Sequence, residues 1–292
     1  MAPKRIAALA IGTATLAASA LYIAVTFQWR AALETLVTAR PAWFLLGGSA
    51  AVLGYWMTRA LRWSYLMRGM QSTPGFFDLY LCSSVALGLA VLTPLQSGEA
   101  FKVELLRKYA GGARLPGYSA FLIERTADLY VVAAMAAISL AAPILAIAVV
   151  VLPLGIFFAL RRVRVGGRLG QFVAHLQGGV GSLWKLMVLL ALTALGWIIV
   201  ALGWQACLLS LSIRLDLLDV VGLVCIVTLA STLTFIPGGL GIADASAAAL
   251  LIRHGVDLPL AQAGAILLRG FTPLVVALGI AHLLWLRGRG TL

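Results

Sequence analysis

The chain has 292 residues, of which 62% are hydrophobic and 11% charged, with a mean hydropathy of +1.02. A soluble domain needs more polar residues to cover its surface, so the composition predicts an integral membrane protein. The net charge of +12 does not indicate nucleic-acid binding, because the basic residues gather in short segments between apolar runs, as topology-setting charges do. The three cysteines lack pairing or ligand spacing, so we expect no disulfide, metal or cofactor.

Apolar runs of roughly twenty residues predict helices that cross a bilayer. The first run follows Lys4 and Arg5 and contains Ala18-Ser19-Ala20, which resembles a signal-peptidase site. Its length favours an uncleaved first helix. The sequence therefore predicts an all-α polytopic membrane protein with about six full spans. These lie at about 6–27, 43–66, 117–141, 144–161, 185–211 and 259–286.

Two further segments, 78–110 and 217–254, begin as apolar runs, reach a break rich in Pro, Gly and Ser, and continue as shorter helices. The second arm of the first segment, 98–110, carries five charged residues. Such an arm does not cross hydrocarbon, because each charge costs about 2.5–3.5 kcal/mol at the centre of a helix. We therefore expect two re-entrant helical hairpins, whose broken backbone is surrounded by protein or by a water-filled cavity.

The basic residues set the expected topology. With the N-terminus in the cytoplasm and both hairpins re-entrant, fourteen basic residues, Lys102 among them, fall inside and four fall outside. This bias places both termini in the cytoplasm. The basic cytoplasmic segment 161–184 then joins the two halves of the chain, and its later part, 169–183, is expected to be a short interfacial or connecting segment.

The two hairpins are also related in sequence. An offset of 143 residues aligns Pro94 with Pro237 and Gly98 with Gly241, and prolines and glycines do not match merely because a sequence is apolar. We predict one transmembrane domain, 1–292, that contains an inverted-topology repeat. Repeat one covers about 43–142 and repeat two about 185–286. Paired broken helices of this kind are typical of transporters whose substrate site lies near the midplane of the bilayer.

The break of the second hairpin, "PGGLG", predicts an anion site. Gly238, Gly239 and Gly241 precede a short helix. Free backbone N–H groups at the N-terminus of a helix favour a negatively charged group.

Charged residues within the predicted spans are the other candidates. Arg59 and Arg62 share one helix face, and we expect Arg59 to face the interior and Arg62 to recruit substrate from the cytoplasmic side. Glu124 and Asp128 are four residues apart and Arg125 and Asp128 are three apart, so Asp128 lies near both on the predicted helix. A structural ion cluster is one interpretation of these residues, and a charged substrate cavity is the other.

In the second interpretation, each half supplies one arginine to the cavity. Arg125 would lie near Glu99 of the first hairpin, and Arg269 would lie opposite Asp244 of the second. Arginine suits this task because its planar guanidinium binds a phosphate or a carboxylate through two hydrogen bonds.

Several ordered motifs resemble one known family. They are "RALRW" at 59–63, "P-x3-GE" at 94–99, "ERTADL" at 124–129, "PGGLGIADA" at 237–245 and "LLRGFT" at 267–272. Over nearly the whole chain, the sequence is similar to the lysylphosphatidylglycerol synthase transmembrane-region family. That family comprises the flippase half of the bacterial multiple peptide resistance factor and its stand-alone relatives. It often carries Glu where this chain has Asp244.

The resemblance implies that a lipid is moved between the leaflets of the bacterial inner membrane. Fused members move aminoacylated phosphatidylglycerol, and other lipids are attributed to stand-alone members. The 292 residues contain no aminoacyl-transferase domain, so synthesis of the lipid is not expected here. We also find no P-loop, which leaves movement either passive or coupled to an ion.

The sequence thus predicts a lipid translocator for an anionic headgroup rather than an enzyme, with Arg125 and Arg269 contacting the headgroup. Two other functions stay open. One is a membrane enzyme that uses Glu99, Glu124 or Asp128 as acid or base, and the other is a non-catalytic assembly factor. The expected partner is the membrane lipid, and a homo-oligomer and a separate lipid-synthesising enzyme stay open as further partners.

Overall fold

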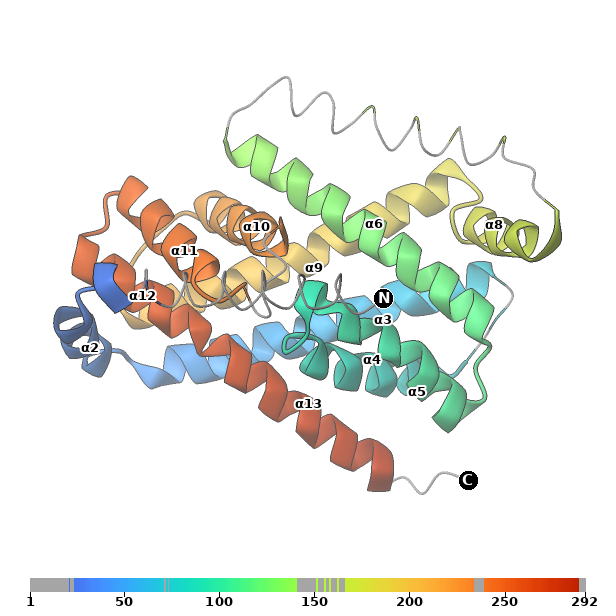
Figure 1. The fold of residues 1–292 in the computed structure, drawn as a ribbon, viewed down its shortest axis with the longest axis horizontal. Coiled ribbons are helices and arrows are strands. Elements are labelled where there is room, and N and C mark those ends of the chain that lie inside the picture. The colour runs from blue at the N-terminus through green and yellow to red at the C-terminus, as the bar shows by residue number, and fades with distance from the viewer. Residues whose placement is uncertain are drawn as a thin grey trace, which may run out of the picture.

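The computed structural model describes residues 24–70, 74–140, 166–233 and 239–288, together with a few isolated positions. Every regular element in these ranges is a helix, in agreement with the predicted all-α class (Figure 1). In the first half these are α2 (Trp29–Val37), the π-helical turn η1 (Trp43–Gly47), α3 (Gly48–Gly69), α4 (Phe76–Ala90), the 3-10 turn η2 (Pro94–Ala100), α5 (Phe101–Ala110) and α6 (Arg114–Ser139). In the second half they are α8 (Gly167–Gly179), α9 (Leu183–Ser210), α10 (Leu217–Leu233), α11 (Ile242–Arg253), α12 (Leu258–Arg269) and α13 (Phe271–Gly288).

Several helices match the predicted spans. η1 and α3 cover 43–66, α6 covers most of 117–141, and α9 covers 185–210 of the span 185–211. Within the described ranges, α9 and the run from Leu258 to Gly288 are long and apolar enough to cross a membrane. The predicted spans 6–27 and 144–161 lie largely outside the described residues.

The predicted span 259–286 is not one uninterrupted helix. It divides at Gly270 into α12 and α13. Pro273 lies in the first turn of α13, and proline has no N–H to donate to the carbonyl of Arg269, four residues earlier. The missing hydrogen bond accounts for the interruption.

Both predicted helix–break–helix segments are present. α4 and α5 are joined by η2, which starts at Pro94, and α10 and α11 flank the second break. Two glycines of that break have positive φ, +60° for Gly239 and +86° for Gly241, a conformation that glycine adopts without a steric penalty. The two helix pairs lie in opposite halves of the view in Figure 1. Their re-entrance into a bilayer and their inverted repeat stay predictions.

Each helix pair packs into its own apolar core. One core surrounds Trp56, Trp63 and Leu66 of α3 and includes α4 and α5. The other surrounds Leu208 of α9 and Leu223 of α10 and includes α11 and α12. α3 and α9 lie side by side (Figure 1). α9 joins the two cores, because its residues Leu186 and Leu189 belong to the first core and Ala201 and Leu208 to the second.

Two helices lie outside the predicted spans. α2 is held against α12, where the backbone N–H of Gln28 donates to Oε1 of Gln262 at 2.8 Å. α8 occupies most of 169–183, where a short interfacial or connecting segment is expected, and it packs on α6.

Candidate functional site

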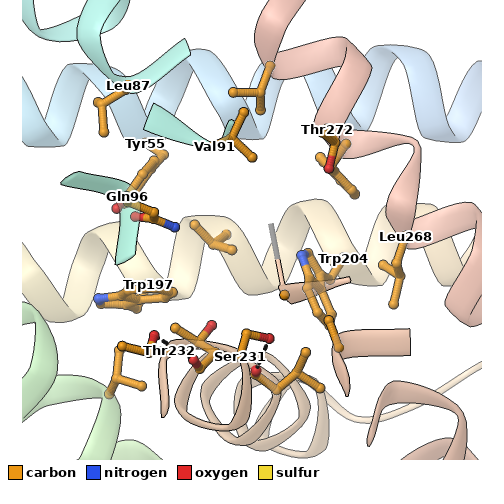
Figure 2. Close-up of a pocket in the computed structure, with 18 of the residues that line it drawn as sticks. Tyr55, Leu87, Val91, Gln96, Trp197, Trp204, Ser231, Thr232, Leu268 and Thr272 are labelled. Atoms are coloured by element: carbon orange, nitrogen blue, oxygen red, sulfur yellow. Dashed lines mark hydrogen bonds between the residues drawn. The ribbon is translucent and has the colours of Figure 1, made fainter. Parts of the chain in front are cut away.

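A cavity of about 500 Å³ lies between the two halves of the fold (Figure 2). Its wall includes Gln96 from the first break and Gly239 from the second, with side chains of α3, α6, α9 and α12. Most of the lining is apolar, and a few polar groups converge on it, as in binding sites for small molecules or headgroups. Among the described residues, four charged side chains line it: Arg125, Asp128, Asp244 and Arg269.

In the described part of the chain, a buried cluster of seven charged side chains forms the first-half wall. We call it the ion cluster, and its members are Arg59, Arg62, Glu99, Lys102, Glu124, Arg125 and Asp128. They come from α3, η2, α5 and α6, which are far apart in sequence. Charges at this depth are tolerable only when they are paired and hydrogen-bonded.

Each carboxylate of the ion cluster contacts at least two cations. Asp128 accepts from Nη1 of Arg62 at 2.7 Å and also binds Arg59. Glu124 accepts from Nε of Arg62 at 3.2 Å and also binds Lys102. Nη1 of Arg62 further donates to Oγ1 of Thr193 on α9 at 2.8 Å, which ties the ion cluster to the second half of the chain.

Glu99 is the point where the ion cluster meets the first break. Its carboxylate is fully buried and binds Arg59, Arg125 and Lys102, with Nζ of Lys102 at 3.0 Å. The predicted contact between Arg125 and Glu99 is therefore present. The side chain of Arg125 is 27% exposed, whereas the other members are exposed by 8% or less. Arg125 is thus the cation that the ion cluster presents to the cavity.

Two charged residues are more deeply buried than the sequence indicates. The side chain of Lys102, which the sequence assigns to the cytoplasmic side, is fully buried in the protein, and its Nζ lies 4.7 Å from the ring centroid of Trp63. Arg62 is expected to recruit substrate, but it is 2% exposed and bound on several sides. A buried, fully engaged guanidinium does not suit a recruiting role, so both residues belong to the structural part of the ion cluster.

Arg269 and Asp244 form the second-half wall. Nε of Arg269 donates to Oδ1 of Asp244 at 2.9 Å, and Nη2 donates to Oδ2 at 2.6 Å. This is the contact that the sequence predicts, and its geometry is bidentate. The side chains are 26% and 12% exposed, so this pair is more accessible than the centre of the ion cluster.

The second break differs in one respect from the predicted anion site. The backbone N–H of Gly241 donates to Oδ2 of Asp244 at 3.0 Å, so the chain itself already occupies this donor. Asp244 therefore acts as the anion at the N-terminus of α11. Gly239 contributes its carbonyl, which lies 3.4 Å from Nη2 of Arg269, and Gly238 lies outside the described residues.

Uncharged polar residues, for which the sequence pattern gives no signal, complete the cavity. The hydroxyls of Ser231 and Thr232 donate to carbonyls of their own helix, α10, at 2.6 and 2.8 Å. Their oxygens also have lone pairs that accept hydrogen bonds. Figure 2 shows both hydroxyl residues on one side of the cavity, with Trp197 and Trp204 next to them. The cavity thus offers donors at its arginines and acceptors along α10.

The fold and the site define an all-helical membrane protein with a charged cavity between two pairs of broken helices. A family model described as the lysylphosphatidylglycerol synthase TM region matches residues 5–279. The chain belongs to this family, as the ordered motifs of the sequence indicate. No curated protein matches the chain.

Proposed function

We propose that this protein moves a phospholipid, or a related lipid with an anionic headgroup, between the leaflets of the bacterial inner membrane. The headgroup would occupy the cavity while the acyl chains stay in the bilayer. One observation carries the proposal: Arg125 and Arg269, from opposite halves of the chain, line the same cavity, and each contacts a carboxylate near the helix break of its own half. In this proposal both termini are cytoplasmic and the halves form an inverted repeat.

The charge of the ion cluster supports an anionic ligand. Among the described side chains, it holds four cations, Arg59, Arg62, Lys102 and Arg125, against three carboxylates. An uncompensated positive charge in a low-dielectric region favours the entry of an anion. Because Arg125 is the cation of the ion cluster that lines the cavity, the phosphate of a lipid headgroup would bind there.

The pair formed by Arg269 and Asp244 supports reversible binding. A phosphate offers the guanidinium the same two-oxygen geometry as the carboxylate that already holds it. A headgroup that enters the cavity would take the place of Asp244, and Asp244 would return when the headgroup leaves. Arg269 therefore never has to lie unpaired in the membrane, which would be costly.

The contacts of the carboxylates do not favour the enzyme alternative. Glu99, Glu124 and Asp128 each bind at least two cations. Of the three, only Asp128 lines the cavity, and its oxygens are already bound by Arg59 and Arg62, so it is poorly placed to exchange a proton with a ligand there. The assembly-factor alternative gives no reason for two arginines from opposite halves to line one cavity.

Leaflet exchange in liposomes tests the proposal. The purified protein would be reconstituted with fluorescent phosphatidylglycerol or aminoacylated phosphatidylglycerol, and an impermeant quencher or amine reagent would report exposure in the outer leaflet. We would compare wild type with Arg125→Ala and Arg269→Ala. Arg253→Ala is the matched control, because Arg253 is exposed at the end of α11 and does not line the cavity.

We expect each cavity variant to slow exchange about ten- to a hundredfold, since a hydrogen bond to a charged group contributes about 1.5–3 kcal/mol. Arg253→Ala should exchange lipid at the wild-type rate. Wild-type rates in both folded cavity variants would contradict the proposal. Covalent turnover of the lipid without exchange would favour the enzyme alternative.

A further inference from the structure

Gln96 has an unusual backbone conformation for its residue type. Its φ is +52°, in the left-handed region, and among the described residues only Ser212 shares a positive φ without being glycine. A residue with a Cβ atom is destabilised there, whereas glycine is not. Gln96 lies in η2, the turn of the first break, and its side chain lines the cavity. Strained residues of this kind gather at functional sites.

The second break shows which residue the backbone alone would require. The offset of 143 residues that aligns Pro94 with Pro237 also aligns Gln96 with Gly239. Gly239 has nearly the same φ, +60°, and likewise lines the cavity. Glycine thus satisfies this conformation at the corresponding place, and the first break has glutamine instead. The advantage of glutamine therefore lies in its side chain.

The side-chain amide of Gln96 has a defined orientation. Its Oε1 accepts from Nη1 of Arg125 at 3.4 Å, which leaves the amide NH2 on the other side. Figure 2 shows this nitrogen directed toward the open centre of the cavity. A primary amide in this position donates hydrogen bonds to an acceptor in the cavity. The acceptor would lie next to Arg125, where an anion is most stable.

We propose that Gln96 is a ligand-contacting residue that donates its side-chain N–H to a phosphate oxygen of the lipid headgroup bound beside Arg125. This inference rests on the proposed function, because it assumes that a phosphate-bearing lipid occupies the cavity. Gln96 then supplies a donor that Gly239 does not supply in the second half. The two halves of the cavity are therefore unequal, because only the Arg125 side adds an amide donor to its arginine when the phosphate lies there.

A pair of glycine substitutions separates the amide from the backbone conformation. Gln96→Gly removes the amide and relieves the left-handed strain, and Ser212→Gly relieves the same strain outside the cavity lining. Gln96→Asn keeps an amide on a residue type that tolerates this conformation. Each variant would be purified in detergent, and its thermal unfolding midpoint measured with phosphatidylglycerol, with diacylglycerol and with inorganic phosphate. Lipid exchange would be measured in parallel.

We expect both glycine variants to unfold at or above the wild-type midpoint without lipid. Only Gln96→Gly should need about tenfold more phosphatidylglycerol for the same stabilisation, the effect of one lost hydrogen bond to a charged group. The phosphatidylglycerol concentration that Gln96→Asn needs should lie between those of Ser212→Gly and Gln96→Gly. Neither diacylglycerol nor inorganic phosphate should stabilise the wild type as phosphatidylglycerol does.

Other results would overturn the inference. Wild-type dependence on phosphatidylglycerol in Gln96→Gly would show that the amide contacts no ligand. Equal stabilisation by diacylglycerol would show that the phosphate is not recognised, and equal stabilisation by inorganic phosphate would make the ligand a free anion. If wild type binds phosphatidylglycerol but exchanges none, the proposed function fails, while a weaker binding in Gln96→Gly still supports the contact.

Discussion

Arg269 holds Asp244 through two of its nitrogens, at 2.9 and 2.6 Å, while the same carboxylate accepts the backbone N–H of Gly241. Asp244 therefore performs two tasks at once. It pairs with a cation across the cavity wall, and it satisfies a free donor at the start of α11. An amide oxygen at this position performs the second task but not the first.

Substitutions of Asp244 should reveal both tasks. Asp244→Ala removes the ion pair and the hydrogen bond to Gly241, and we expect it to lower the free energy of unfolding by about 1–3 kcal/mol. Asp244→Asn keeps an acceptor for Gly241, so its loss should be smaller by about 1 kcal/mol, the usual contribution of a capping side chain. Thermal or denaturant unfolding in detergent measures both. Equal losses would mean that the bond to Gly241 contributes nothing.

Lys102 gives a second prediction, because its burial distinguishes it from its neighbour Lys108. Both lie on α5, but Lys102 is fully buried between Glu99 and Glu124, and Lys108 is exposed. Removing one partner of a buried ion pair destabilises a protein by about 3–5 kcal/mol. We expect Lys102→Met to lower the free energy of unfolding by about this amount.

Lys108→Met is the control for Lys102→Met, since it makes the same chemical change on the same helix. An exposed substitution of this kind should alter stability by about 0.5 kcal/mol or less. Similar losses in the two variants would show that Lys102 is not held in the ion cluster.

The position of Lys102 also shows where sequence analysis stops. The charges of the second arm of the first segment, 98–110, predict that it does not cross hydrocarbon. They do not show which of these side chains point inward. Glu99, Lys102, Val103 and Leu106 are spaced by three and four residues, and all four are buried. This spacing places them on one helix face. The spacing is consistent with an inward-facing Lys102. It does not identify a buried lysine, because a surface lysine has the same spacing to apolar residues by chance.

Other features of the fold follow more directly from the residue types. The prolines and glycines of the two breaks predict where the helices stop, since each removes a helical hydrogen bond or favours a non-helical conformation. The contact of Arg269 with Asp244 is the one that the predicted repeat leads us to expect. By contrast, the left-handed conformation of Gln96 has no local signal, because glutamine rarely adopts it. Only its alignment with Gly239 indicates it.

The crossing of α4 and α13 gives a third prediction. Gly88 and Gly279 lie against each other, and a Cβ atom on Gly88 would lie 2.5 Å from Cα of Gly279. Small residues let helix backbones approach closely in membranes. We expect Gly88→Ala and Gly279→Ala each to lower the free energy of unfolding by about 1–3 kcal/mol, as overpacking does.

Gly288→Ala is the control for this crossing, because no other part of the described structure packs within 4 Å of a Cβ at Gly288, also on α13. It should leave stability unchanged or raise it slightly, since alanine favours helix. The unfolding midpoints of the three variants measure these differences in stability. If alanine at both crossing positions leaves the unfolding midpoint unchanged, the two backbones separate without a loss of stability, and the prediction is wrong.

The inverted repeat gives a fourth prediction, which concerns the sides of the membrane. If the halves are inverted, Arg107 at the end of α5 faces the cytoplasm and Asp257 at the start of α12 faces outward. Single cysteines at these exposed positions can be labelled in spheroplasts with an impermeant maleimide. The native cysteines, Cys82, Cys207 and Cys225, are buried, which keeps the background low.

We expect Asp257→Cys to react in intact spheroplasts and Arg107→Cys to react only after permeabilisation. Arg253→Cys and Lys108→Cys serve as neighbours that should behave like Asp257→Cys and Arg107→Cys respectively, since Arg253 ends α11 and Lys108 lies in the last turn of α5. Labelling of both sites from one side would remove the inverted repeat. The two arginines would then lie in one cavity without the symmetry that alternating access requires, and a binding or enzymatic role would explain them better.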